Sequence, residues 1–100
     1  MASNSDIRKA VKEFAARVFK SEQIDTVLVE PDIGAIGTEI LRISVVFKKR
    51  PKRKLRADDK AKLRNSTISY LEDAGDERFP VVTYMTADEL NQINAINAGR

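Results

Sequence analysis

The sequence contains no cysteine and no histidine. Without cysteine the chain has no disulfide, no thiolate nucleophile and no cysteine ligand for a metal ion. Without histidine it lacks the usual general base near neutral pH and the commonest metal ligand. A Ser–His or Cys–His nucleophile therefore cannot form within this chain. Both absences argue against a hydrolytic or thiol-based enzyme.

Glycine-rich phosphate loops are absent too. The sequence has no GxxxxGK[ST], no GxGxxG after a strand, and no Gly-Ser dipeptide of the kind that a nucleotidyltransferase needs. Three carboxylate pairs remain, Asp58/Asp59, Asp76/Glu77 and Asp88/Glu89. The first and last pairs open predicted helices, where carboxylates complement the helix dipole. We therefore predict a protein that is not an enzyme and that uses no cofactor.

Acidic residues also gather around a predicted turn. Glu30, Asp32 and Glu39 lie close to the segment PDIGAIG, and such carboxylates can bind a hard cation weakly. A solvated turn explains them better, so we predict no metal site.

Long apolar runs are missing. No stretch approaches the roughly 18 consecutive apolar residues of a membrane span. The first residues carry no basic region followed by an apolar one, so no secretion signal is predicted. A chain of 100 residues, 42% hydrophobic and 33% charged, suits one folded domain. We expect a single cytoplasmic domain over residues 1–100, without a membrane partner.

Hydrophobic periodicity predicts a first amphipathic helix over residues 3–20. Its apolar residues recur at intervals of three and four and form one stripe, made of Ile7, Ala10, Val11, Phe14, Ala15 and Val18. Ser3 with Asp6, or Ser5 alone, is suited to cap its start. We expect Phe14 and Val18 to contact Leu41, Ile43 or Val45 on the second strand.

Two further helices are predicted after the strands of the hairpin. Asp58 and Asp59 begin the second helix, and Gly75 fits the left-handed position just past its end. Thr86 and Glu89 form a capping box for a short terminal helix.

Three β-branched or alternating segments predict strands. The first, IDTVLVE, ends before Pro31, and the second runs from Thr38 to Phe47. Between them PDIGAIG supplies a turn, in which Gly34 and Gly37 can take positive φ. The third strand, RFPVVTYMT, contains Pro80, which cannot donate to a ladder and therefore indicates a sheet edge or a strand start.

The order α-β-β-α-β, with a short C-terminal helix, predicts an α+β two-layer sandwich with two helices on one face of a three-stranded mixed sheet. This topology resembles the type II KH-like folds. In KH domains a GxxG loop between two helices clamps the nucleic-acid backbone. Here GAIG, residues 34–37, lies between two strands, so the resemblance implies the fold and no KH binding site.

A second resemblance is to small uncharacterised bacterial proteins. It is carried by VEPDIGAIGTEILRISVVF and GDERFPVVTYMTADEL. Such proteins are found beside genes for HEPN-like, toxin-type helical proteins. The resemblance implies an antitoxin-like component of a bacterial gene pair.

The most distinctive stretch is KKRPKRKLR, residues 48–56. Seven of the 18 Lys/Arg lie there, so the rest of the chain has 11 Lys/Arg against all 15 Asp/Glu, a net charge of −4. Lys and Arg neutralise phosphates without reading sequence, and the run has no aromatic residue for base stacking. We predict a flexible loop at about 48–57 in which no residue enters the core.

We expect this run to contact the phosphate backbone of RNA or DNA. The predicted contact residues are Lys48, Lys49, Arg50, Lys52, Arg53, Lys54 and Arg56, extended along the second helix by Lys60, Lys62 and Arg64. The alternative is a protein partner, for which the predicted contact residues are Ile33, Ile36, Ile40, Val46 and Tyr84. Ile33 and Ile36 are unusual in a turn, because large apolar residues gain little there unless something covers them.

Overall fold

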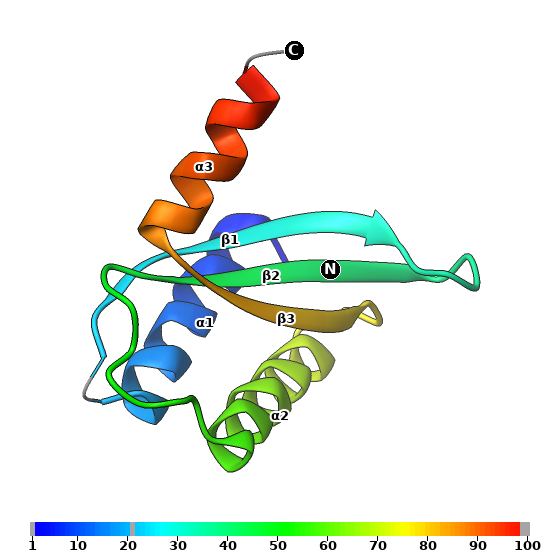
Figure 1. Cartoon of the computed structure of the whole chain (residues 1–100). Helices are drawn as coiled ribbons and strands as arrows, with labels where there is room; N and C mark the ends of the chain where they lie inside the picture. The colour runs from blue at the N-terminus through cyan, green and yellow to red at the C-terminus, as the bar shows by residue number, and fades with distance from the viewer. Residues whose placement is uncertain (1, 21, 99–100) are drawn as a thin grey trace.

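The computed structural model describes residues 2–20 and 22–98, and its helices and strands form two layers (Figure 1). In chain order the elements are α1 (Asn4–Val18), β1 (Ile24–Ile33), β2 (Glu39–Phe47), α2 (Ala57–Asp73), β3 (Phe79–Thr86) and α3 (Ala87–Ala98). β2 is the central strand, antiparallel to β1 and parallel to β3. α1 and α2 pack against each other and cover one face of the sheet. The predicted α+β sandwich is therefore confirmed.

The core lies between this sheet face and the two helices. Alternate residues of β2, from Leu41 to Phe47, point toward the helices and are almost fully buried. The buried partners on the helices are Ile7, Val11 and Ala15 of α1 and Leu63, Thr67 and Leu71 of α2. Burying each large apolar side chain is worth about 1.5–3 kcal/mol, so this layer supplies most of the driving force for folding.

Phe14 and Val18 have a smaller part in the core than we expected. Both are half-buried at the flank of the α1 stripe. The Phe14 ring packs edge-to-face on Tyr70 of α2, with 6.3 Å between the ring centroids. Phe14 therefore joins the two helices, and the smaller residues beside it face the sheet.

The hairpin is longer than predicted. β1 continues past Pro31 to Ile33, whereas the prediction ended it before the proline. Because β1 is an edge strand, the missing N–H of Pro31 is tolerated there. The turn is correspondingly tight, with the Gly34 N–H donating to the Thr38 carbonyl at 2.7 Å. Gly37 takes a φ of 83°, but Gly34 does not have a positive φ.

The helix ends follow the predicted caps. The Ser3 hydroxyl accepts from the Asp6 N–H at 3.1 Å, and Gly75 follows α2 with a φ of 71°. At α3 the Thr86 and Glu89 side chains each accept from the other's backbone N–H at 3.2 Å, so this capping box is present. No helix within the described residues is long and apolar enough to cross a membrane.

A buried ion pair fixes the connection between α2 and β3. The Arg78 guanidinium donates to both oxygens of Asp76, at 2.7 Å from Nη2 and 3.0 Å from Nε, and also to the Ala2 carbonyl at 3.4 Å. Neither side chain is appreciably exposed. The hydrogen bonds from Arg78 lower the pKa of Asp76 from 3.8 to about 2. This pair links the start of β3 to the beginning of the chain.

The ion pair gives a prediction for acid stability. Since the folded pKa of Asp76 lies below its unfolded value, the pair stabilises the fold above pH 4 and is lost as pH falls toward 2, a loss of about 2 kcal/mol. Asp76→Asn should cost about 3–5 kcal/mol near pH 7, because it leaves the Arg78 charge buried and unpaired. Urea unfolding, followed by circular dichroism at several pH values, measures both the loss of stability in acid and the cost of the substitution. Asp73→Asn, at an exposed carboxylate, is the control and should leave the stability nearly unchanged. An Asp76→Asn variant that is as stable as the parent would contradict a stabilising role for this ion pair.

Candidate functional site

The basic loop, residues 48–56, leaves the carboxyl end of β2 and leads into α2. Both of its ends are held. The Lys48 N–H donates to the Gln23 carbonyl at 3.0 Å, and Leu55 packs against the core, with Pro51 also half-buried. The expectation that no residue of the loop enters the core is therefore wrong for Leu55. The packing of Leu55 ties the loop to the core, whereas its charged side chains stay exposed.

Every Lys and Arg of the basic loop is exposed. The ion pair that involves the loop joins Arg56 Nη2 to Asp58 Oδ2 at 3.8 Å, and both side chains are largely in solvent, where such a pair contributes little. Within the described part of the chain, the other six cations of the loop have no carboxylate oxygen within 4 Å. Their charge is thus available to an anion from outside.

Two cations of α2 extend this charge along the edge of the sheet. Lys60 and Arg64 are exposed and one helical turn apart, so they share one side of α2. The Lys60 ammonium lies 5.4 Å from the centre of the Tyr84 ring, a cation–π distance. Lys62 is exposed as well, but two residues from Lys60 it points to a different side of the helix. The structure therefore groups Lys60 and Arg64 with the basic loop.

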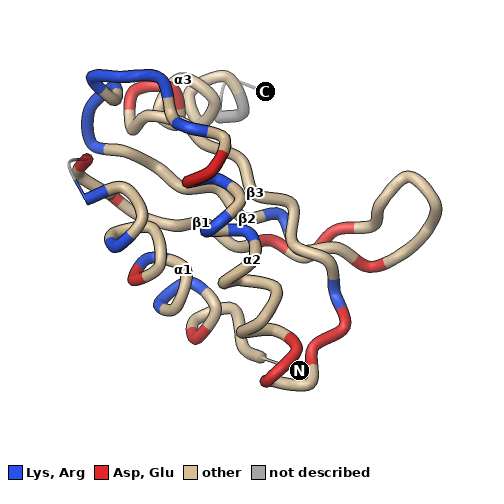
Figure 2. Tube along the Cα trace, turned by 90° about the horizontal axis from the view of Figure 1, so that it is seen from below, with Lys and Arg blue, Asp and Glu red and all other residues tan. Residues whose placement is uncertain are grey.

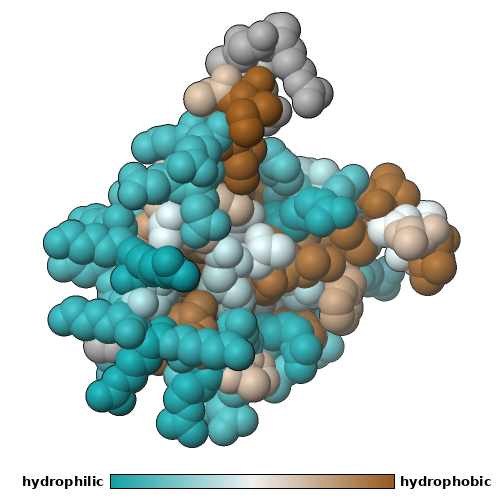
Figure 3. Space-filling view, viewed as in Figure 1, coloured by the Kyte–Doolittle hydropathy of each residue, from teal (hydrophilic) through white to brown (hydrophobic). Residues whose placement is uncertain are grey.

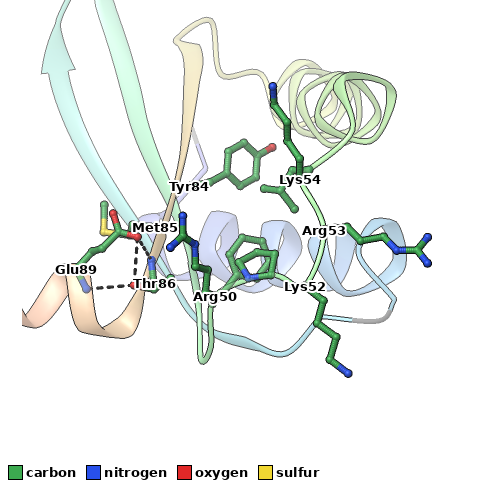
Figure 4. A pocket seen from close by; sticks show the side chains of 11 residues that line it. Arg50, Lys52, Arg53, Lys54, Tyr84, Met85, Thr86 and Glu89 are labelled. Atoms are coloured by element: carbon green, nitrogen blue, oxygen red, sulfur yellow. Dashed lines mark hydrogen bonds between the residues drawn. The ribbon is translucent and has the colours of Figure 1, made fainter.

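A hollow of about 390 Å³ lies between the basic loop and the end of β3 (Figure 4). In Figure 4 Lys52 and Arg53 extend outward from the loop, whereas Arg50 lies on its inner side, near Thr86. The lining residues are Phe47, Arg50, Pro51, Lys52, Arg53, Lys54, Leu55, Tyr84, Met85, Thr86 and Glu89. The hollow thus has a rim that is cationic along the loop and carries Glu89 on the opposite side, and a floor that is aromatic and apolar.

The floor is an aromatic cluster. Tyr84 packs edge-to-face on Phe19, with 5.7 Å between ring centroids, and stacks on Phe47 at 6.3 Å. Its hydroxyl is buried without a hydrogen-bond partner among the described residues. Burial raises the pKa of Tyr84 to about 12, although the nearby Arg64 charge opposes this rise. Tyr84 therefore supports the basic loop from beneath and does not belong to an exposed apolar surface.

The basic loop and the carboxylates of the β1–β2 hairpin lie toward opposite ends of the molecule, although Asp88 and Glu89 at the start of α3 lie beside the basic loop. Figure 2 shows the Lys and Arg of the basic loop at one end and the carboxylates of the β1–β2 hairpin toward the other. Among these carboxylates, Asp32 accepts hydrogen bonds from Arg42 Nε and from the Ile33 N–H, which lower its pKa. No group of three or more Asp and Glu side chains suited to a metal ion occurs in residues 2–20 and 22–98. The hairpin is thus an acidic end that balances the basic one.

The residues predicted to contact a protein partner do not form one surface. Ile33 and Ile36 are exposed at the hairpin, but Ile40 is nearly buried and Val46 is fully buried. Tyr84 lies on the opposite, helix-covered face. Sequence reasoning missed three exposed apolar residues, Phe79, Ile93 and Ile96. The signal for the last two was present, because α3 carries no charged residue from Leu90 to Ala98.

The buried Tyr84 hydroxyl gives a prediction for stability. Tyr84→Phe removes an unpaired polar group, so it should leave the free energy of unfolding unchanged or raise it by about 1 kcal/mol. Because the folded pKa of Tyr84 exceeds its unfolded value of 10, the parent should lose stability between pH 10 and 12 and the Phe variant should not lose this part. Denaturant unfolding and a tyrosinate absorbance titration measure the two effects. A clear loss of stability near pH 7 would show that the hydroxyl has a partner.

Comparison of the chain with protein-family models, with curated proteins and with solved structures found no match. The KH-like topology and the likeness to small bacterial proteins therefore remain resemblances. The geometry and charge of the basic loop are the features of this chain that bear on its function.

Proposed function

We propose that the protein is a binding module that contacts the phosphate backbone of RNA or DNA through its basic loop. Lys49, Arg50, Arg53 and Lys54 are the central contacts, and Lys60 and Arg64 extend the surface along α2. The chemistry is charge neutralisation of phosphates, in which Lys and Arg release condensed counterions from the nucleic acid. The proposal requires no catalytic step.

The observation that carries the proposal is the concentration of exposed positive charge in the basic loop. Six exposed cations of the loop lack a carboxylate partner among the described residues, and the acidic hairpin lies toward the other end of the molecule. A connection that only had to be solvated would not need seven cations while the rest of the chain carries a net charge of −4. Concentrated positive charge creates the potential that attracts polyanions.

The same geometry favours contact with the backbone over reading of bases. Base stacking needs a free aromatic face. The loop has no aromatic residue, and the Tyr84 ring already packs on Phe47 and lies beneath the Lys60 ammonium. We therefore expect little preference among nucleotide sequences.

Salt dependence tests the proposal. If about five phosphates are neutralised, log affinity should fall with log salt at a slope near −4.5 for duplexes and near −3.5 for single strands. A fourfold rise in salt should then weaken binding by about 10²–10³. Fluorescence anisotropy with labelled RNA and DNA oligonucleotides measures the slopes. Replacement of Lys49, Arg50, Arg53 and Lys54 by Ala should remove most of the slope while the fold is kept.

A matched variant separates local contact from overall charge. Replacement of Arg8, Lys9, Lys12 and Arg17, which are exposed on α1, also removes four positive charges and should keep most of the binding. Equal losses in the two quadruple variants would mean that only net charge matters. Undetectable binding of the parent at low salt would refute the proposal and favour a protein partner.

A further inference from the structure

The large apolar side chains exposed on the described surface form two groups at opposite ends of the molecule. At the hairpin end Ile33 is 59% exposed, Ile36 87% and Phe79 56%; on α3 Ile93 is 46% exposed and Ile96 63%. Phe79 belongs to the hairpin end because it pairs with Ile40, next to the turn. Figure 3 shows apolar patches on α3, on the sheet and at the hairpin tip, seen from one side of the molecule. Large exposed apolar groups of this kind mark interaction surfaces.

α3 has fewer contacts with the rest of its own chain than α1 and α2 have. It begins directly after Thr86, and the Thr86–Glu89 capping box fixes its direction, so that it projects from the sheet (Figure 1). Its main contacts are with β2 and β3, where it begins. Beyond Glu89 it has no charged residue for stabilising side-chain pairs, and an isolated helix of 12 residues is marginal in water. The helix needs a surface on which to place Ile93 and Ile96.

The sheet has a free face of suitable size. The face away from α1 and α2 carries the partly exposed Leu28, Val81 and Met85 and the nearly buried Ile40. It also carries the exposed Asp32–Arg42 ion pair toward the hairpin and a contact between the Ser44 and Thr83 hydroxyls at 3.2 Å near its middle. Three strands of eight or more residues form a surface about 14 Å wide and 26 Å long. α3, about 18 Å long and 10 Å wide, fits on such a surface.

We propose that two copies of the chain form a two-fold dimer through these faces, with α3 of each copy packed on the hairpin end of the other copy's sheet. α3 starts at the carboxyl end of β3. When two sheets stack with their strands antiparallel, this end of one copy lies over the hairpin end of its partner. Ile93 and Ile96 then meet the partner's Phe79 and the partner's Ile33 or the partner's Ile36. Because the dimer is two-fold symmetric, this contact forms twice. One arrangement therefore covers the apolar residues of α3 and those of the hairpin end in both copies.

Charge favours this antiparallel arrangement over the parallel one. The antiparallel dimer places each basic end near an acidic hairpin end, whereas a parallel dimer would place the two basic loops together. Complementary charges orient partners and like charges exclude the wrong orientation. The second copy is therefore the occupant that fits both the apolar groups and the charges of this chain.

The dimer can be tested by mixing two variants that carry opposite charges at the proposed contact. Sedimentation equilibrium of the parent should give twice the 11.2 kDa mass of one chain. Ile93→Glu and Phe79→Lys should each weaken self-association by at least about 100-fold, because both symmetric contacts are lost. An equimolar mixture of the two variants should dimerise again, since the new Glu meets the new Lys in one contact and the parent residues meet in the other.

Asn91→Glu is the control, because residue 91 lies on the opposite side of α3 from Ile93; this variant should remain dimeric. Circular dichroism verifies that each variant is folded. A parent that stays monomeric at the highest soluble concentration would overturn the proposal and leave the apolar groups to a different protein. Dimers that persist in Ile93→Glu, or a variant mixture that stays monomeric, would also overturn it.

Discussion

Burial of one face of β2 beneath α1 and α2 is the interaction on which the rest of the structure depends. β2 is the central strand, and its residues from Leu41 to Phe47 alternate between the core and the opposite face. Two helices are enough to cover one face of a three-stranded sheet. α1 and α2 both place their apolar stripes on that face. The other face is left with only α3 near one end. The asymmetry of the core therefore creates the free surface of the molecule.

The parallel pairing of β2 and β3 determines what is placed at each end. Because these strands run in the same direction, both finish at one end of the sheet, where the basic loop and α3 leave it. The β1–β2 turn lies at the other end together with its carboxylates. The basic loop is therefore held at one end of the sheet and the carboxylates of the hairpin at the other. The proposed binding of a polyanion and the proposed pairing of two copies both depend on where this positive charge lies.

Much of the fold could be predicted because it depends on local pattern. Ser3, Gly75 and the Thr86–Glu89 pair end or begin helices through contacts within a few residues, and the sequence contains all the partners. The alternation of apolar and polar residues along 38–47 predicted the central strand for the same reason. The error at Pro31 has a different origin, since a proline ends a strand or not depending on whether that strand is at an edge, which is a property of the whole sheet.

The sequence predicted the positive charge of the candidate site, but not the packing that holds the basic loop in place. The sequence shows seven cations at 48–56, but it cannot show that Leu55 reaches the core or that Lys60 and Arg64, unlike Lys62, face the same side as the loop. Those facts follow from how α2 is rotated on the sheet. Likewise Val46 and Ile36 look equally apolar in the sequence, and only packing decides that the first is buried and the second exposed.

The basic loop also has a consequence for the order in which the chain folds. β1 and β2 pair through a short turn, whereas β3 reaches β2 only after the basic loop and α2 have closed a long segment, which costs more chain entropy. Seven like charges in that segment repel one another and oppose the closure. Dissolved ions screen this repulsion. The hairpin should therefore form at a rate that is nearly independent of ionic strength, while docking of β3 becomes faster as salt is added.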